Sequence, residues 1–146
     1  MKPVLLYDGD CGFCSRIVSI VLRHEKQNSL SFAALKSPVA SVLLRDQPQL
    51  QQTDSVMWVE LDDNQVPQKI LLRSAAALRL CAYLGSWWNL LRIGWLIPKP
   101  WRDKLYDVIA RNRHRLLRNA SCTLPPTADR QRFLETSEDL VSQRAR

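Results

Sequence analysis

The stretch that decides the fold is KPVLLYDGDCGFC, residues 2–14. Its first half is a short apolar run that stops at an Asp-Gly pair, which is the pattern of a buried strand ending in a turn. Apolar residues then return at helical spacing over 17–22, so we expect a helix from near Cys11 to Glu25. The sequence therefore predicts that Cys11 and Cys14 lie where a strand passes into the first turn of a helix.

Length and composition are those of an ordinary globular domain. The chain has 146 residues, of which 46% are apolar and 24% charged, enough for one domain with a proper core. Arginines and a glycine interrupt the longest apolar stretch, 70–97, so no membrane span is expected. The start of the chain is too short for a signal peptide. We therefore expect a cytoplasmic protein, in which a close cysteine pair does redox work or binds metal.

The positive charge is concentrated late in the chain, where residues 99–118 carry +5 of the formal net charge of +7. Such a segment attracts nucleic acid, anionic lipid or an acidic protein, although a solvated helix face is the simpler interpretation. No nucleic-acid module matches, so no nucleic-acid partner is expected. Contact with a membrane surface through the Trp-rich and basic helices is a less favoured alternative.

The rest of the chain predicts a strand-helix-strand-helix-strand-strand-helix order with further helix after it. Strands are expected at 30–35, 56–61 and 69–72, and helices at 38–45, from Ser74 as N-cap to Gly85, at 87–97 and at 101–116, with a loop at 46–54. This order is the thioredoxin-like plan, an α/β fold with a four-stranded mixed sheet and a CxxC between the first strand and helix. We expect one domain over 1–120 and a weakly packed tail over 121–146.

The position of the cysteines suggests thiol-disulfide chemistry. Unsatisfied N–H groups and a partial positive charge at a helix N-terminus stabilise a thiolate, which is the reactive species. Cys11 is expected to be the exposed attacking thiol and Cys14 the resolving thiol, close enough to form a disulfide with it. The alternative is half of a zinc site, but a second close pair is missing because Cys81 and Cys122 stand alone.

Two carboxylates flank the first cysteine. At ~6 Å, Asp10 would repel the Cys11 thiolate by about 0.7 kcal/mol in water and about 3 kcal/mol at an effective dielectric of 20. This opposes the helix terminus, worth about 0.3–1 kcal/mol, so we expect a reducing couple and a disulfide reductase. Asp8 is either a general base for Cys14 or the acceptor of a hydrogen bond that holds the turn.

The same letters allow a second interpretation. VLLYDGD resembles the first motif of haloacid dehalogenase-type phosphatases, which implies Asp8 as nucleophile and Asp10 as general acid. The resemblance ends at Gly12, where that family has Thr or Val. The later acidic pair of that family would have to be Asp62 and Asp63, which fall in a predicted hairpin turn.

With YDGDCGFC in place, the sequence resembles the DCC family of predicted thiol-disulfide oxidoreductases. Further segments that carry the resemblance are RSAAALRL (73–80), IPKPWRDKLYDVIARNRHRL (97–116) and CTLP (122–125). It implies a thioredoxin-like fold and a dithiol site at Cys11 and Cys14 with Asp8 or Asp10. It implies no cofactor or metal, and the partners would be a disulfide-containing protein or small thiol and an electron donor.

One departure from thioredoxins bears on function. Those proteins have a cis-proline before the third strand, whereas Ser55 and its neighbours take that place here. If they do not take over its role, the substrate docks differently. A separate alternative function is a redox-inactive adaptor, which keeps the fold and binds through its basic, Trp-rich helices. For Trp87, Trp88 and Trp95, core packing is the default expectation.

Overall fold

The computed structural model describes residues 2–9, 11–53, 55–116 and 132–136. The elements in chain order are β1 (Lys2–Tyr7), α1 (Gly12–His24), β2 (Ser31–Ala34), α2 (Pro38–Leu43), η1 (Pro48–Gln52), β3 (Met57–Leu61), β4 (Pro67–Leu72), α3 (Arg73–Leu84), η2 (Ser86–Leu96) and α4 (Lys99–Leu116). The predicted strands and helices are confirmed within a few residues. The two differences in type are the 3₁₀ helices η1, where a loop was expected, and η2, where an α-helix was expected.

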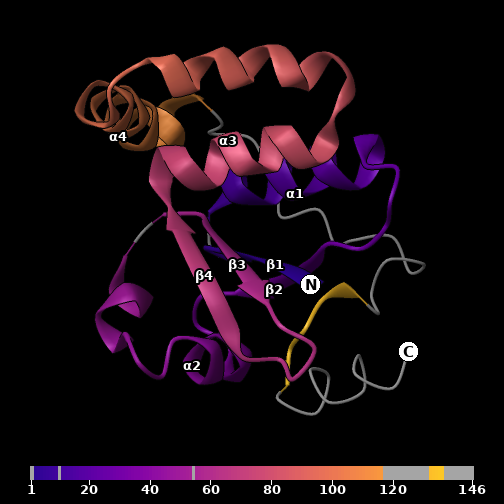
Figure 1. The fold of residues 1–146 in the computed structure, drawn as a ribbon. Helices are drawn as coiled ribbons and strands as arrows, with labels where there is room; N and C mark the ends of the chain where they lie inside the picture. Colours follow the sequence, from indigo (N-terminus) through magenta and orange to yellow (C-terminus); the bar gives the residue numbers. More distant parts are fainter. Residues whose placement is uncertain (1, 10, 54, 117–131, 137–146) are drawn as a thin grey trace.

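In the described part of the chain, the strands form one four-stranded sheet in the order β2-β1-β3-β4 (Figure 1). The β1–α1–β2 unit makes a parallel pair, with Val4 opposite Ser31. β3 runs antiparallel to β1, with Leu6 opposite Met57, and forms a hairpin with β4. The predicted mixed sheet is confirmed, and the architecture is thioredoxin-like.

Helices cover both faces of this sheet: α1 and α3 lie on one face and α2 on the other (Figure 1). Successive residues of β1 point to opposite faces, so Leu5 joins the core under α1 and α3 while Val4 and Leu6 join the core over α2. All three are fully buried. Burying a side chain of this size contributes about 1.5–3 kcal/mol, so both layers stabilise the strand that leads to the cysteines.

A short segment near the C-terminus packs against β2. Phe133 bridges to Phe32 as a parallel neighbour, and the Leu134 N–H donates to the Phe32 carbonyl at 2.8 Å. Leu134 is buried in the core over α2. The sequence predicts a weakly packed tail here, but residues 132–134 pack closely because they satisfy backbone groups at the open edge of β2.

The start of α3 also differs from the prediction. Leu72 is the N-cap and the helix begins at Arg73, so Ser74 lies inside the first turn and does not cap it. Arg73 has a φ of 51°, an uncommon value for a residue with a Cβ. The predicted end at Gly85 is confirmed, and its φ of 63° explains why a glycine ends the helix.

Candidate active site

The sheet brings both cysteines to one end of the molecule, where β1 passes into α1. The Cys11 N–H donates to the Asp8 carbonyl at 3.2 Å and closes the turn after the strand. Cys11 is the N-cap of α1, with extended backbone angles, and its carbonyl accepts the Ser15 N–H at 3.1 Å. Cys14 follows in the first turn of the helix. This is the strand-to-helix junction that the sequence predicts.

Both thiols are buried, each with 2% of its surface exposed. The apolar cluster that contains them also contains Leu5 of β1, Val56 before β3 and Ala76 of α3. The prediction that Cys11 is an exposed thiol is therefore wrong. The reason is that residues distant in sequence complete a core around the turn. Neither cysteine forms a disulfide in the structure.

The N-terminus of α1 carries the partial positive charge of a helix end. The first turn of the helix contains no acidic residue that would neutralise its positive end. The Cys11 side chain makes no cap hydrogen bond to the helix. Asp8 is partly exposed beside the turn. Asp10 lies outside the described residues, so its repulsion of a thiolate stays a prediction.

Ser55 and Val56 precede β3 and lie at the same end of the sheet as Asp8, since Leu6 faces Met57 in the antiparallel pair. Ser55 is 4% exposed, and its hydroxyl has no hydrogen-bond partner within the described chain. Among those residues no peptide bond is cis. The position that a cis-proline takes in thioredoxins thus holds a serine with a buried hydroxyl, directly before Val56 of the cluster around the thiols.

Helix α4 lies across this end of the molecule, above the N-termini of α1 and α3 (Figure 1). Its Tyr106 hydroxyl accepts the Val56 N–H at 3.3 Å. Tyr106 therefore joins α4 to the segment next to the thiols. Sequence reasoning missed this role because the partner lies 50 residues away and the pattern around Tyr106 is that of a solvated helix face.

Arg73 and Ser74, at the start of α3, attach α4 to that helix, and Ser74 is not the N-cap that the sequence predicts. The buried Ser74 hydroxyl donates to Asp103 at 2.5 Å, and Arg73 pairs with Asp107 at 3.7 Å. Both acidic residues of the basic segment therefore contact α3, Asp103 through a partly buried hydrogen bond and Asp107 through an exposed ion pair.

The geometry opposes the phosphatase interpretation. Asp62 follows β3, which runs antiparallel to β1, so it lies at the other end of the sheet from Asp8. Six residues of strand separate these ends by about 20 Å. The Asp62 carboxylate instead accepts the Asn64 and Val66 N–H groups at 2.9 and 2.8 Å and holds the hairpin turn.

The described residues contain no group of three His, Cys, Asp or Glu side chains placed to hold a metal. Cys81 lies on α3, and burial raises the pKa of its thiol, although a backbone hydrogen bond partly offsets that effect. It therefore ionises less readily than an exposed cysteine. Cys122 lies outside the described residues. None of the described helices could cross a bilayer.

Comparison with known proteins gives a consistent result. Residues 5–119 match the family model described as DCC1-like thiol-disulfide oxidoreductase. The chain is 32% identical to the uncharacterized protein YuxK of Bacillus subtilis, over 90% of this chain and 93% of that protein. It is 31% identical to the chloroplastic DCC family protein At1g52590 of Arabidopsis thaliana, over 84% of this chain and 70% of that protein. No solved structure matches.

Proposed function

The chain belongs to the DCC1-like thiol-disulfide oxidoreductase family, and from that membership we propose that it exchanges disulfides through Cys11 and Cys14. The observation that carries the proposal is the placement of both thiols at the N-terminus of α1, in one buried cluster. A helix N-terminus stabilises the thiolate that attacks, and one turn of helix keeps the second thiol nearby.

The reaction would proceed in two steps. The Cys11 thiolate attacks one sulfur of a substrate disulfide, which forms a mixed disulfide and releases one substrate thiolate. The Cys14 thiolate then attacks the Cys11 sulfur and releases the second substrate thiolate. The substrate gains two electrons, and the protein is left with a Cys11–Cys14 disulfide. A dithiol donor returns the two electrons and the protons.

Asp8 is the described carboxylate that stands closest in sequence to this pair. We propose that it receives the Cys14 proton in the second step, and its partial exposure gives it a path to solvent. The proposal includes Asp10, whose charge would make the couple more reducing. A disulfide-containing protein or small thiol would be the substrate, and the cytoplasm, where thiols stay reduced, would be a suitable compartment.

Because both thiols are buried, a substrate can reach them only after local opening. The segment before β3 and the first turn of α3 contribute to the cluster around them. Helix α4 is hydrogen-bonded to each of these two segments, through Tyr106 to Val56 and through Asp103 to Ser74. We therefore expect local opening to limit the rate of disulfide exchange, so that the rate levels off at high substrate concentration. The limit should be stricter for protein disulfides than for small disulfides.

The test is reduction of insulin disulfides with dithiothreitol as donor, comparing the chain with Cys11→Ser, Cys14→Ser and a Cys81→Ser control. We expect loss of turnover in the first two variants and full activity in the control. Cys14→Ser should trap a mixed disulfide at Cys11, visible by mass spectrometry. Turnover that survives Cys11→Ser would contradict the proposal, and a wild type without turnover would favour the redox-inactive adaptor.

The equilibrium between the chain and a glutathione buffer gives the reduction potential of the 11–14 pair. A potential close to that of thioredoxin, about −270 mV, supports a reductase, whereas one near that of DsbA, about −120 mV, indicates an oxidant. Asp10→Asn should shift the potential in the oxidising direction, because it removes a charge that disfavours the thiolate.

A further inference from the structure

Helix α4 presents its apolar face to solvent. Trp101, Leu105, Val108 and Ile109 are between 41% and 73% exposed, and at 3.6 residues per turn they fall within an arc of about 100°. An amphipathic helix of a globular protein normally turns such a face toward the core. Here the side chains turned inward lie on the opposite arc: Asp103, Tyr106, Asp107 and Ala110.

The preceding helix extends this surface. Leu90, Ile93, Trp95 and Leu96 of η2 are between 53% and 83% exposed. The absence of a side chain at Gly94 allows close packing on α3, since a Cβ there would lie 3.2 Å from Leu78. The apolar side chains beside it therefore face outward.

The two elements follow each other in the chain, both pack on α3, and they meet where the Arg102 guanidinium stacks over the Trp95 ring at 5.0 Å. We call η2 and α4 together the apolar hairpin. Of the exposed large hydrophobic residues in the described part of the chain, all but Val42 and Val66 belong to the hairpin or its connecting Ile97. Large apolar side chains gathered in one region of the surface, and not scattered singly, mark an interaction site, so we take the hairpin as the surface to be explained.

The charge of the hairpin identifies the chemistry of its partner. Lys104 and Arg111 are exposed along one side of the apolar arc. The acidic residues of the helix, Asp103 and Asp107, are engaged with α3, so the outward surface is positive. A second copy of this chain would bring like charges together, whereas an anionic surface would complement them.

We propose that the apolar hairpin docks on the surface of an anionic phospholipid bilayer, with α4 lying parallel to the membrane plane. Exposed Trp, Leu and Ile beside exposed Lys and Arg suit the boundary between headgroups and acyl chains. Tryptophan is enriched at this boundary in membrane proteins, and the hairpin exposes Trp95 and Trp101. Because α4 also reaches the segment beside the thiols, docking would bring that end of the sheet close to the membrane.

The test is flotation with phosphatidylcholine vesicles, with and without about one-third phosphatidylglycerol, together with the tryptophan emission spectrum. We expect the chain to float with the anionic vesicles and to shift its emission to shorter wavelength. High salt and the variant Lys104→Glu/Arg111→Glu should weaken binding about tenfold, since electrostatic attraction to anionic lipid falls off under screening.

The apolar contribution has a matched control. Trp101→Glu/Leu105→Glu should lower the bound fraction at least about tenfold, whereas Val42→Glu/Val66→Glu, which alters two side chains 52% and 51% exposed elsewhere, should bind within about twofold of wild type. If the first variant fails to fold by circular dichroism, Leu96→Glu, at the most exposed of these side chains, replaces it.

Three results would overturn the proposal: no flotation of wild type with anionic vesicles, equal binding to neutral vesicles, or equal loss in the Val42→Glu/Val66→Glu control. Absence of vesicle binding, combined with concentration-dependent dimers that Trp101→Glu/Leu105→Glu abolishes, would show that a second copy covers the hairpin. Insulin reduction plays no part in these measurements, so the outcome is independent of the proposed redox function.

Discussion

The carboxylate of Glu60 links β3 to α3 through a small, well-defined set of contacts. It accepts hydrogen bonds from Arg79 at 2.8 Å and from the Trp58 indole at 3.2 Å. Burial raises the pKa of Glu60, but the hydrogen bonds from Arg79 and Trp58 and the charges of Arg79 and Lys69 outweigh it, so the pKa lies below its ordinary value. The ionised form is therefore the one that the fold stabilises.

We predict a pH-dependent effect of Glu60→Gln. Because the folded-state pKa is depressed, Glu60 contributes stability above its unfolded value and loses it as the pH falls through the folded value. At pH 7 the variant should lower the free energy of unfolding by about 0.5–1.5 kcal/mol, since Arg79 is half exposed and its charge is screened.

Urea denaturation of both proteins at several values between about pH 7 and pH 3 measures this difference. The difference in the free energy of unfolding between wild type and Glu60→Gln should become smaller as the pH falls. Asp46→Asn alters an exposed carboxylate outside these contacts and is the control. A gap that stays constant with pH would mean that the carboxylate acts by packing and not by charge.

Whether a feature of a single residue could be predicted depends on how close in sequence its cause lies. The position of Cys11 at the N-cap and of Gly85 at the end of α3 could be predicted, because both depend on neighbours within a few residues. The burial of Cys11 and the partner of Ser74 could not, since Val56 and Asp103 lie 45 and 29 residues away. Nothing in the local pattern marks the positive φ of Arg73.

At the scale of elements, the attachment of α4 to α3 is polar on its inner side. Ser74 and Asp103 make a partly buried hydrogen bond, whereas Arg73 and Asp107 make an exposed ion pair with side chains 47% and 37% accessible. A buried hydrogen bond to a charged group contributes about 1.5–3 kcal/mol, whereas an exposed ion pair contributes at most about 1 kcal/mol. Ser74 should therefore determine how firmly α4 is held.

We predict that Ser74→Ala lowers the free energy of unfolding by about 1–3 kcal/mol, because it leaves the Asp103 carboxylate without this donor. Arg73→Ala should change it by less than about 1 kcal/mol. Hydrogen exchange should show faster opening of α4 in Ser74→Ala and little change in β1, β2 and β3. If both variants lower the free energy of unfolding equally, the Ser74 hydrogen bond does not hold α4 more firmly than the exposed ion pair does.

Helix boundaries were predictable from periodicity and turn residues, but the orientation of α4 was not. Its apolar stripe is visible in the sequence, and a stripe alone does not state which side faces the core. The polar partners on α3 decide that orientation, and they belong to another element. The same holds for Trp95, which was expected in the core and is 53% exposed.

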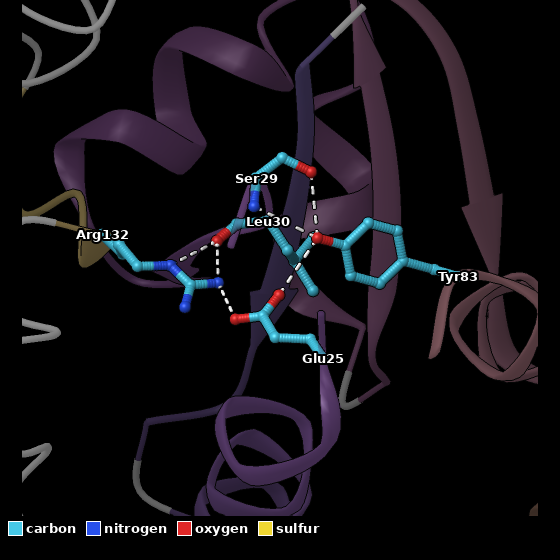
Figure 2. A network of polar contacts seen from close by, with 5 residues as sticks. All are labelled: Glu25, Ser29, Leu30, Tyr83 and Arg132. Carbon is cyan, nitrogen blue, oxygen red and sulfur yellow. Dashed lines mark hydrogen bonds and ion pairs between the residues drawn. The ribbon is translucent and has the colours of Figure 1, made fainter. Parts of the chain in front are cut away.

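At the scale of the whole molecule, a polar network fastens the segment near the C-terminus to the sheet (Figure 2). Arg132 donates to the Leu30 carbonyl through Nε at 3.0 Å and Nη2 at 2.6 Å, and it forms an ion pair with Glu25. The Tyr83 hydroxyl donates to the same Glu25 carboxylate at 3.0 Å and contacts Ser29. The end of α1, the start of β2, α3 and the C-terminal segment thus meet at one fully buried carboxylate.

We predict that Arg132→Met lowers the free energy of unfolding by about 3–5 kcal/mol, because it leaves the Glu25 carboxylate buried without its cation. Glu25→Gln/Arg132→Met should recover part of this loss, since the neutral amide tolerates burial better. Arg79→Ala, which removes a half-exposed arginine, is the control and should cost about 1 kcal/mol or less. Thermal and urea unfolding of the four proteins give the comparison.

The order of the strands could be predicted from the order of the elements, because a strand-helix-strand unit and a hairpin leave few ways to build a mixed sheet. The contribution of residues 132–134 could not be predicted, because it depends on an open strand edge and on a carboxylate more than 100 residues earlier. Contacts of that range lie outside any local pattern.

The enclosure of Cys11 and Cys14 also has a consequence for chemical survival. Peroxide converts accessible thiolates to sulfenic acid, which thiols can reverse, and onward to sulfinic and sulfonic acids, which they cannot. With 2% of each residue accessible, the closed molecule offers oxidants almost no target. Oxidants would reach the thiols only when the molecule opens locally, so the packing that encloses Cys11 and Cys14 also protects them.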